Sequence, residues 1–227
     1  MEKVVTVILI LSLCFMPVQI QAKSVTSGTD GNGNKWTYNT SAKTLTFTGN
    51  KAISDFTLNG HDREPSWYRW SDKTEHIVIE EGITGIGSEA FSSFTETKSI
   101  TMGESVKRIN RMAFWANVSL REIKLSSNIT VIQGDALSGG RELETIKLPM
   151  RLRKMCSLSG QEKLEKIVMP DSITNMQSAM FSECKKLKYI KLPAKIRKIK
   201  SYDFAGCKKL KKLTIPKSVK TVSMSAF

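Results

Sequence analysis

The 227-residue sequence is poor in the residue types on which most metal sites, catalytic networks and covalent frameworks depend. Its two histidines, His61 and His76, argue against a histidine-based metal site, and four cysteines exclude a disulfide-dense scaffold. Asp30 to Asn34 imitates the start of a calcium loop, but Lys35 stands where that loop needs glycine. Neither histidine lies in a recognisable catalytic triad motif. We therefore expect no cofactor, no metal ion and no enzymatic activity.

Long apolar runs are also scarce, and the main one lies at the start of the chain. Val4 to Met16 is almost wholly apolar, follows Lys3 and ends at Pro17, with the small Ala22 soon after. This run is shorter than the ~20 residues that cross a bilayer, so a membrane anchor is disfavoured. The pattern predicts a signal peptide over residues 1–22 and no transmembrane segment. We expect an exported protein, at the cell surface or outside the cell.

What the sequence has in abundance is internal repetition. An apolar residue holds the same place in seven successive units, at spacings of 23, 23, 23, 21, 23 and 23 residues: Ile77, Ile100, Ile123, Ile146, Ile167, Ile190 and Leu213. Further apolar residues recur two, six and nine positions later in every unit. A bulky residue follows fourteen positions later in six units. Because no single unit can bury its own apolar edge, the units are expected to stack around one continuous core.

This period and the L-x-x-L-x-L openings of most units predict a leucine-rich repeat solenoid. The fold class expected is an α/β repeat solenoid, mainly β and right-handed. It should have a parallel sheet on its concave side and short helical turns on its convex side. The fourth unit is two residues short, and we expect Leu158 to replace its missing phenylalanine, with a local kink in an unbroken stack.

Several stretches resemble the repeats of BspA-like leucine-rich repeat proteins, whose unit is about 23 residues long. The matching stretches are Ile215 to Val222, Ala226-Phe227, Phe181 to Cys184 and Phe204 to Cys207. Met180 and Asp203 depart from the family, standing where it usually has alanine. The resemblance implies a secreted or cell-surface protein, with adhesion as an expected role.

The resemblance also bears on the cysteines. Cys184 and Cys207 occupy the same place in adjacent units, so a disulfide between them is geometrically conceivable. A column of small buried thiols is the favoured interpretation, as the family pattern implies.

Residues 23–73 do not repeat, and we expect them to form an N-terminal β capping module before a repeat domain over residues 74–227. The repeat domain then has seven units, the last incomplete. Lys35–Tyr38 and Leu45–Thr48 are predicted strands. The expected capping contacts, for which a carbohydrate-binding aromatic platform is the alternative, are Phe47, Phe56, Trp67 and Trp70.

Acidic residues are nearly absent from the last part of the chain. Residues 185–227 contain 14 basic residues and one acidic residue, Asp203, a balance of +13, whereas residues 1–184 contain 21 basic and 20 acidic. A basic patch of this kind favours polyanionic partners, although a merely solvated lysine surface is an equal alternative. Positions that alternate with the buried strand residues point outward, which gives the predicted ligand contacts: Lys188, Tyr189, Lys191, Lys211 and Lys212, and more weakly Lys124, Lys147 and Lys166.

Together these features predict a non-catalytic binding or adhesion module that recognises extracellular ligands through its concave repeat face. The expected partner is an extracellular or host-surface protein or glycan, polyanionic ones included, and not a specific nucleic acid. The alternative is a structural or assembly protein. It would self-associate through the apolar side chains of the last unit, among them Val219, Val222 and Phe227.

Overall fold

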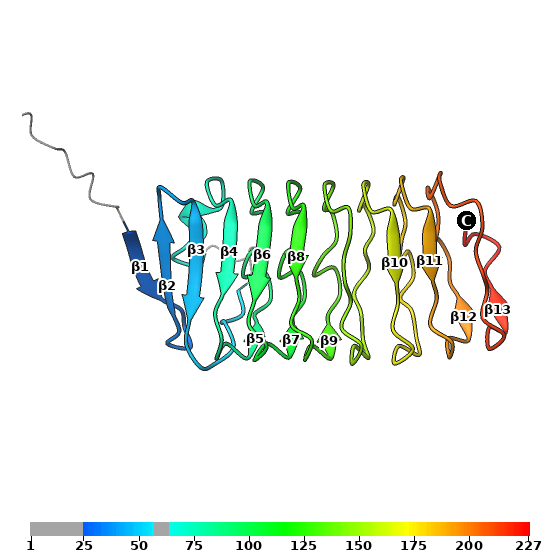
Figure 1. The fold of residues 1–227 in the computed structure, drawn as a ribbon, viewed down its shortest axis with the longest axis horizontal. Coiled ribbons are helices and arrows are strands. Elements are labelled where there is room, and N and C mark those ends of the chain that lie inside the picture. Colours follow the sequence, from blue (N-terminus) through cyan, green and yellow to red (C-terminus); the bar gives the residue numbers. More distant parts are fainter. Residues whose placement is uncertain (1–24, 57–63) are drawn as a thin grey trace, which may run out of the picture.

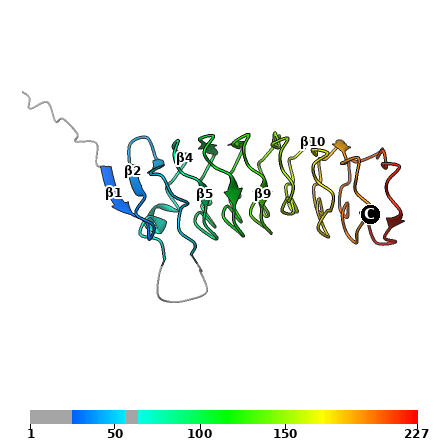
Figure 2. The ribbon, with the colours of Figure 1, turned by 90° about the horizontal axis from the view of Figure 1, so that it is seen from below.

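The computed structural model describes residues 25–56 and 64–227 and shows a solenoid of stacked coils behind an N-terminal β module (Figures 1 and 2). The predicted signal peptide, residues 1–22, lies outside the described residues. We number the coils 1 to 7 after the repeated apolar position, from Ile77 in coil 1 to Leu213 in coil 7. The mainly-β solenoid predicted from the repeat is confirmed.

Coils 1, 2, 3, 5 and 6 each send one strand to the same side of the stack, which we call the strand face. Parallel pairing with a constant shift of one repeat joins these strands, as in Ile77↔Ile100 and Ile100↔Ile123. The strands of this face are β4 (His76–Ile79), β6 (Ser99–Met102), β8 (Glu122–Lys124), β10 (Lys166–Val168) and β11 (Tyr189–Lys191).

The other side of each coil, the return side, carries only two-residue strands, which lie along the lower edge of the view in Figure 1. They also pair in parallel, Ile86↔Ile109 and Ile109↔Ile132 being examples. The strands of the return side are β5 (Gly85–Ile86), β7 (Arg108–Ile109), β9 (Val131–Ile132), β12 (Lys198–Ile199) and β13 (Thr221–Val222).

The N-terminal module extends the strand face with an antiparallel β-meander. Its strands are β1 (Val25–Thr29), β2 (Lys35–Asn39) and β3 (Thr44–Thr48), and a short 3-10 helix, η1 (Tyr68–Trp70), follows. β3 then pairs in parallel with β4, so the sheet passes from the module into coil 1 without a break. The two strands predicted here are confirmed within one residue at each end, whereas β1 had no clear sequence signal.

Aromatic side chains of this module close the first coil. Trp67 is buried, and its indole nitrogen donates a hydrogen bond to the Ala90 carbonyl at 3.0 Å. Its ring lies edge-on to Phe47 and Phe56, at 4.9 and 5.0 Å between centroids. Phe47 in turn meets Phe91 of coil 1 at 5.3 Å. Phe47 and Trp67 are buried in these contacts and offer no ring face to a sugar, whereas the other two predicted residues, Phe56 and Trp70, are half-buried.

The repeated apolar positions form the core. Those of coils 1 to 6 are buried except for the half-buried Leu125, and Phe91 stacks on Phe114 at 5.4 Å between centroids. In coil 4 the fully buried Leu158 takes the place of the missing phenylalanine, as predicted. Cys156, Cys184 and Cys207 are free, and the Cys184 and Cys207 thiols donate hydrogen bonds to carbonyls of the preceding coil. The interpretation as small buried thiols is confirmed for Cys184, whereas Cys207 is half-buried against the same core.

The helical turns expected between the two sides do not form; the one described helix is η1. Turns replace them, and in coils 1, 2, 3, 5 and 6 this turn has two residues in the left-handed region of backbone space. In coil 1 these are Glu89 (φ 57°) and Ser93 (φ 60°), and in coil 2 Met112 (φ 53°) and Ala116 (φ 57°). A left-handed residue interrupts the i→i−4 bonding of a right-handed helix. The expectation of helices was therefore wrong.

Pairing between coils lapses at a few places along the described chain. On the strand face, β8 has no partner strand in coil 4, which contributes only the isolated bridge Thr145↔Lys166. On the return side, residues 174–176 of coil 5 form no strand, and pairing resumes at β12 and β13. The stack nevertheless continues through its buried side chains. These two gaps coincide with the hollows described below.

Candidate functional site

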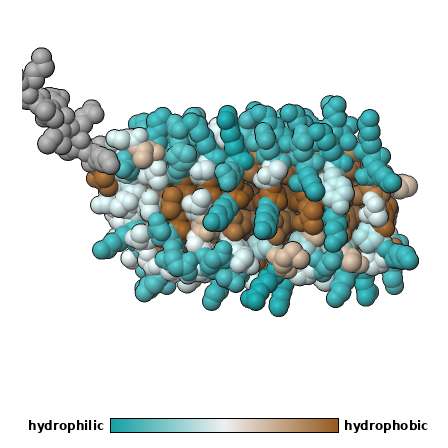
Figure 3. All heavy atoms as spheres, in the orientation of Figure 1, coloured by the Kyte–Doolittle hydropathy of each residue, from teal (hydrophilic) through white to brown (hydrophobic). Residues whose placement is uncertain are grey.

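The strand face presents two kinds of surface. Figure 3 shows apolar residues gathered along the middle of this face, over the strands, with hydrophilic residues along both edges. Exposed side chains that alternate with the buried isoleucines stand out from this apolar band. Because the coils repeat at the spacing of neighbouring β-strands, ~4.8 Å, equivalent side chains of adjacent coils can interact.

Three of the predicted ligand contacts lie on or beside β11. Tyr189 is 50% exposed, and the Lys166 ammonium lies 5.3 Å from the centre of its ring. Lys188 forms an ion pair with Glu165 of the preceding coil at 2.9 Å, and Lys191 lies 3.8 Å from Asp171. The strand face therefore brings these residues together, but it places an acidic partner beside each of the two lysines.

The other two predicted contacts lie outside the sheet that contains β11. Lys211 and Lys212 are exposed, but residues 211–214 form no strand and pair with no part of β11. Lys211 occupies the position equivalent to Lys188, and like charges opposite one another disfavour strand pairing. Neither lysine forms an ion pair with any residue that the structure describes.

The one acidic residue in this part of the chain does not offset the charge. Asp203 is fully buried and accepts hydrogen bonds from the backbone amides of Met180 and Lys200, at 3.3 and 2.7 Å. Burial raises the pKa of its carboxyl above the usual range. Asp203 is thus a structural residue of the turn, and among the 14 basic residues of 185–227 it interacts electrostatically with Lys200.

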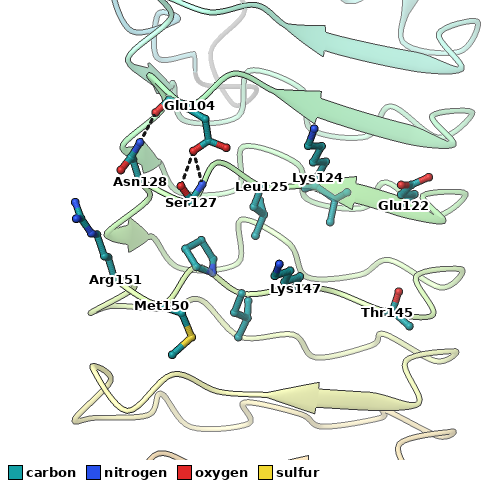
Figure 4. Close-up of a pocket in the computed structure, with 13 residues that line it drawn as sticks. Glu104, Glu122, Lys124, Leu125, Ser127, Asn128, Thr145, Lys147, Met150 and Arg151 are labelled. Carbon is teal, nitrogen blue, oxygen red and sulfur yellow. Dashed lines mark hydrogen bonds between the residues drawn. The ribbon is translucent and has the colours of Figure 1, made fainter.

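A hollow of about 680 Å³ opens on the strand face where β8 lacks a partner (Figure 4). Lys124 and Lys147, two of the weaker predicted contacts, both line it from equivalent positions of coils 3 and 4. The 76% exposed Met150 and Arg151 lie at its other end. Like charges at Lys124 and Lys147 account for the missing pairing.

Glu104 at the margin of this hollow is held as an anion. Its carboxylate accepts hydrogen bonds from the amide and hydroxyl of Ser127, at 2.8 and 2.6 Å, as Figure 4 shows. These bonds lower the pKa of Glu104. A carboxyl of this kind is a poor proton donor near neutral pH, so Glu104 is not suited to act as a general acid.

A second hollow, of about 770 Å³, lies on the return side and was not predicted from the sequence. It opens between coils 5 and 6 where residues 174–176 form no strand, and Ser218 of coil 7 contributes to its wall. The only sequence signal for it was the cluster of cations after Pro193. Its remaining lining is Thr174, Asn175, Ala194, Lys195, Arg197, Lys198 and Lys200.

Within residues 25–56 and 64–227 no cluster of histidine, cysteine, aspartate or glutamate has the geometry of a metal site. The same residues include no helix long and apolar enough to cross a membrane.

Comparison with known proteins gives a match by repeat type. The family described as the BspA type leucine-rich repeat region matches residues 64–159 and 154–227, with six copies of the repeat. None of the curated proteins compared matches the chain.

Two solved structures share the fold. A leucine-rich repeat protein from Bacteroides ovatus superposes with a TM-score of 0.66 at 22% identity, over 85% of this chain and 54% of the other. The T. pallidum leucine-rich repeat protein superposes with a TM-score of 0.58 at 20% identity, over 83% of this chain and 89% of the other. The chain thus spans about half of the length of the B. ovatus protein.

Proposed function

Since the chain belongs to the BspA-type leucine-rich repeat family, we propose that it is a non-catalytic binding protein that acts outside the cell and captures polyanionic ligands with its basic C-terminal coils. The observation that carries this proposal is the charge distribution. Residues 185–227 hold 14 basic residues against a single, buried acid. A rigid array of cations on a solenoid attracts a polyanion without an induced fit.

The strand-face contacts of this capture are Lys188, Tyr189, Lys191, Lys211 and Lys212. Lys211 and Lys212 have no acidic partner in the described chain, so binding a ligand there breaks no existing ion pair. Lys188 and Lys191 do have partners, but both pairs are exposed, with side chains 47–60% accessible. Exposed pairs contribute only about 0–1 kcal/mol, so an incoming polyanion can replace them.

Heparin chromatography tests this function. We expect the protein without residues 1–22 to elute only at high NaCl. A variant with Lys188, Lys191, Lys211 and Lys212 changed to Gln should elute earlier, because each lost cation contact lowers the salt dependence of binding. Equal and weak retention of both proteins would reduce the basic coils to a solvated surface and overturn the proposal.

A second candidate function is assembly through coil 7. Its apolar positions, unlike those of coils 1 to 6, are accessible: Ile215, Val222 and Phe227 are 45, 41 and 66% exposed. Contiguous apolar surface of this kind marks contacts between chains. Sedimentation velocity across a concentration series would support assembly if a dimer forms and Phe227→Asp abolishes it. A monomer at all concentrations would count against it.

A further inference from the structure

The return-side hollow between coils 5 and 6 combines four cations with no acid. Lys195, Arg197 and Lys198 are exposed and Lys200 is half-buried, all on coil 6. None of the four forms an ion pair with a residue in the described ranges, in contrast to Lys188 and Lys191 on the strand face. The charge of this hollow is therefore held by no direct ion pair in those ranges, although Lys200 also interacts electrostatically with the buried Asp203.

Neutral hydrogen-bonding groups complete the lining. Thr174 and Asn175 come from coil 5, where residues 174–176 form no strand of their own. The Ser218 hydroxyl lies 2.7 Å from the carbonyl oxygens of both Ala194 and Ile196, which fixes that side of the hollow. The lining contains no aromatic side chain, and its one apolar side chain is Ala194.

The charge continues on both sides of the hollow. Coil 4 carries Arg153-Lys154 directly before the buried Met155, and coil 6 carries Arg197-Lys198 directly before the buried Ile199. Coil 5 places the uncharged Thr174-Asn175 at the same two positions. Two coils span roughly 10 Å along the stack, so two cation pairs flank a polar trough at about that separation.

We propose that this trough binds a linear sulfated polysaccharide, with one sulfate held in the hollow by Arg197 and the surrounding lysines. The inference rests on the proposed capture of polyanions and assigns it a second site and a ligand class. An arginine guanidinium matches a tetrahedral oxyanion with two parallel hydrogen bonds, and lysines add charge without fixed geometry. Thr174, Asn175 and Ser218 are suited to sugar hydroxyls.

Other polyanions fit the same lining less well. Single-stranded nucleic acid gains much of its affinity by stacking bases on aromatic rings, which this lining lacks. A membrane surface favours apolar side chains that enter the acyl boundary, and Ala194 alone cannot supply them. The trough therefore favours a ligand that offers charge and hydroxyls together.

Three variants, each losing four positive charges, separate a site from a general charge effect. The return-side variant carries Lys195, Arg197, Lys198 and Lys200 changed to Gln, and the strand-face variant is the one described above. The control changes four exposed cations outside the C-terminal coils to Gln: Lys35, Lys51, Lys107 and Arg111. The double variant Lys195→Gln/Lys198→Gln, confined to fully surface-exposed side chains, serves if the return-side variant melts early.

Binding of a fluorescent heparin fragment is measured over a range of NaCl concentrations. We expect the return-side variant to lower the magnitude of the slope of log K against log [NaCl] by about 3.6, from roughly 0.9 for each of four lost contacts, and the control to change it by less than 1. Fully desulfated heparin should not bind. Single-stranded DNA and anionic phosphatidylserine vesicles should compete more weakly than heparin at equal charge.

The outcomes distinguish the two proposals. If the return-side variant behaves like the control while the strand-face variant loses binding, the inference fails and the proposed function stands. If all three variants lose affinity equally, charge alone is responsible and no site exists. If DNA competes as well as heparin, the sulfated ligand is wrong. If the unaltered protein does not bind heparin at physiological salt, the proposed function itself fails.

Discussion

Single acidic side chains link neighbouring coils at the edge of the strand face, and Glu75 is the clearest case. Its two carboxylate oxygens lie 2.6 Å from the ammonium groups of Lys43, in the N-terminal module, and Lys98, in coil 2. These hydrogen bonds and charges lower the pKa of Glu75 to about 2. One carboxylate thus ties the module, coil 1 and coil 2 together.

The depressed pKa of Glu75 predicts a specific pH dependence. A carboxyl whose pKa falls on folding contributes stability above its unfolded value, near 4.5, and this contribution is lost as the pH falls from there towards 2. Carbon-detected NMR of the side-chain carboxyl should give a midpoint near 2, and Lys98→Met should raise it. A midpoint near 4.5 in the unaltered protein would show that the two ion pairs do not persist in solution.

The state of a single side chain could be predicted from the sequence where burial determines it, but not where it depends on a charged partner in another coil. The buried thiol of Cys184 follows from its place in an apolar column. The acidic partners of Lys188 and Lys191 were not predicted from the sequence. The pairing of Glu165 with Lys188 depends on a register of 23 residues and on the reach of both side chains. A count of charges along the sequence therefore did not show that two of the strand-face lysines have acidic partners.

At the scale of elements, the turn between the two sides of a coil depends on left-handed residues that are mostly not glycine. The second left-handed residue of this turn is Ser93, Ala116 or Glu183 in some coils and Gly139 or Gly206 in others, all with positive φ. This mixture of residue types explains why the sequence did not disclose the turn. The apolar columns, in contrast, predicted the strands because burial tolerates few substitutions.

Replacing Ala116 by glycine should stabilise the protein. The alanine adopts φ 57°, which costs an L-residue about 1–2 kcal/mol, whereas glycine adopts it freely. The greater freedom of glycine in the unfolded chain offsets about 0.4–1 kcal/mol of this, so a net gain of roughly 0.5–1 kcal/mol is expected in urea unfolding. Gly139→Ala, at the same position of the next coil, should have the opposite sign. Destabilisation by Ala116→Gly would contradict the left-handed conformation.

At the scale of the whole molecule, ion pairs between coils run along the stack and then stop. Acidic residues of one coil meet lysines of the next at Glu142–Lys163, Glu162–Lys185 and Glu165–Lys188. Coil 6 offers no such acid to coil 7, where lysines alone occupy the equivalent positions. The 23-residue spacing placed lysines of coil 7 opposite lysines of coil 6; it did not predict that strand pairing is lost between these two coils.

This change of sign along the stack predicts opposite responses to salt at its two ends. Raising NaCl from 0.01 to 0.5 M shortens the screening length from about 30 Å to well below 10 Å. Screening should relieve repulsion among the lysines of coils 6 and 7 and weaken the attraction of Glu75 for Lys43 and Lys98. Hydrogen–deuterium exchange should therefore slow in residues 208–214 and quicken or stay unchanged in residues 96–101. Exchange that moves in the same direction at both ends would show a general salt effect, and the charge pattern would then not govern how tightly the coils pack.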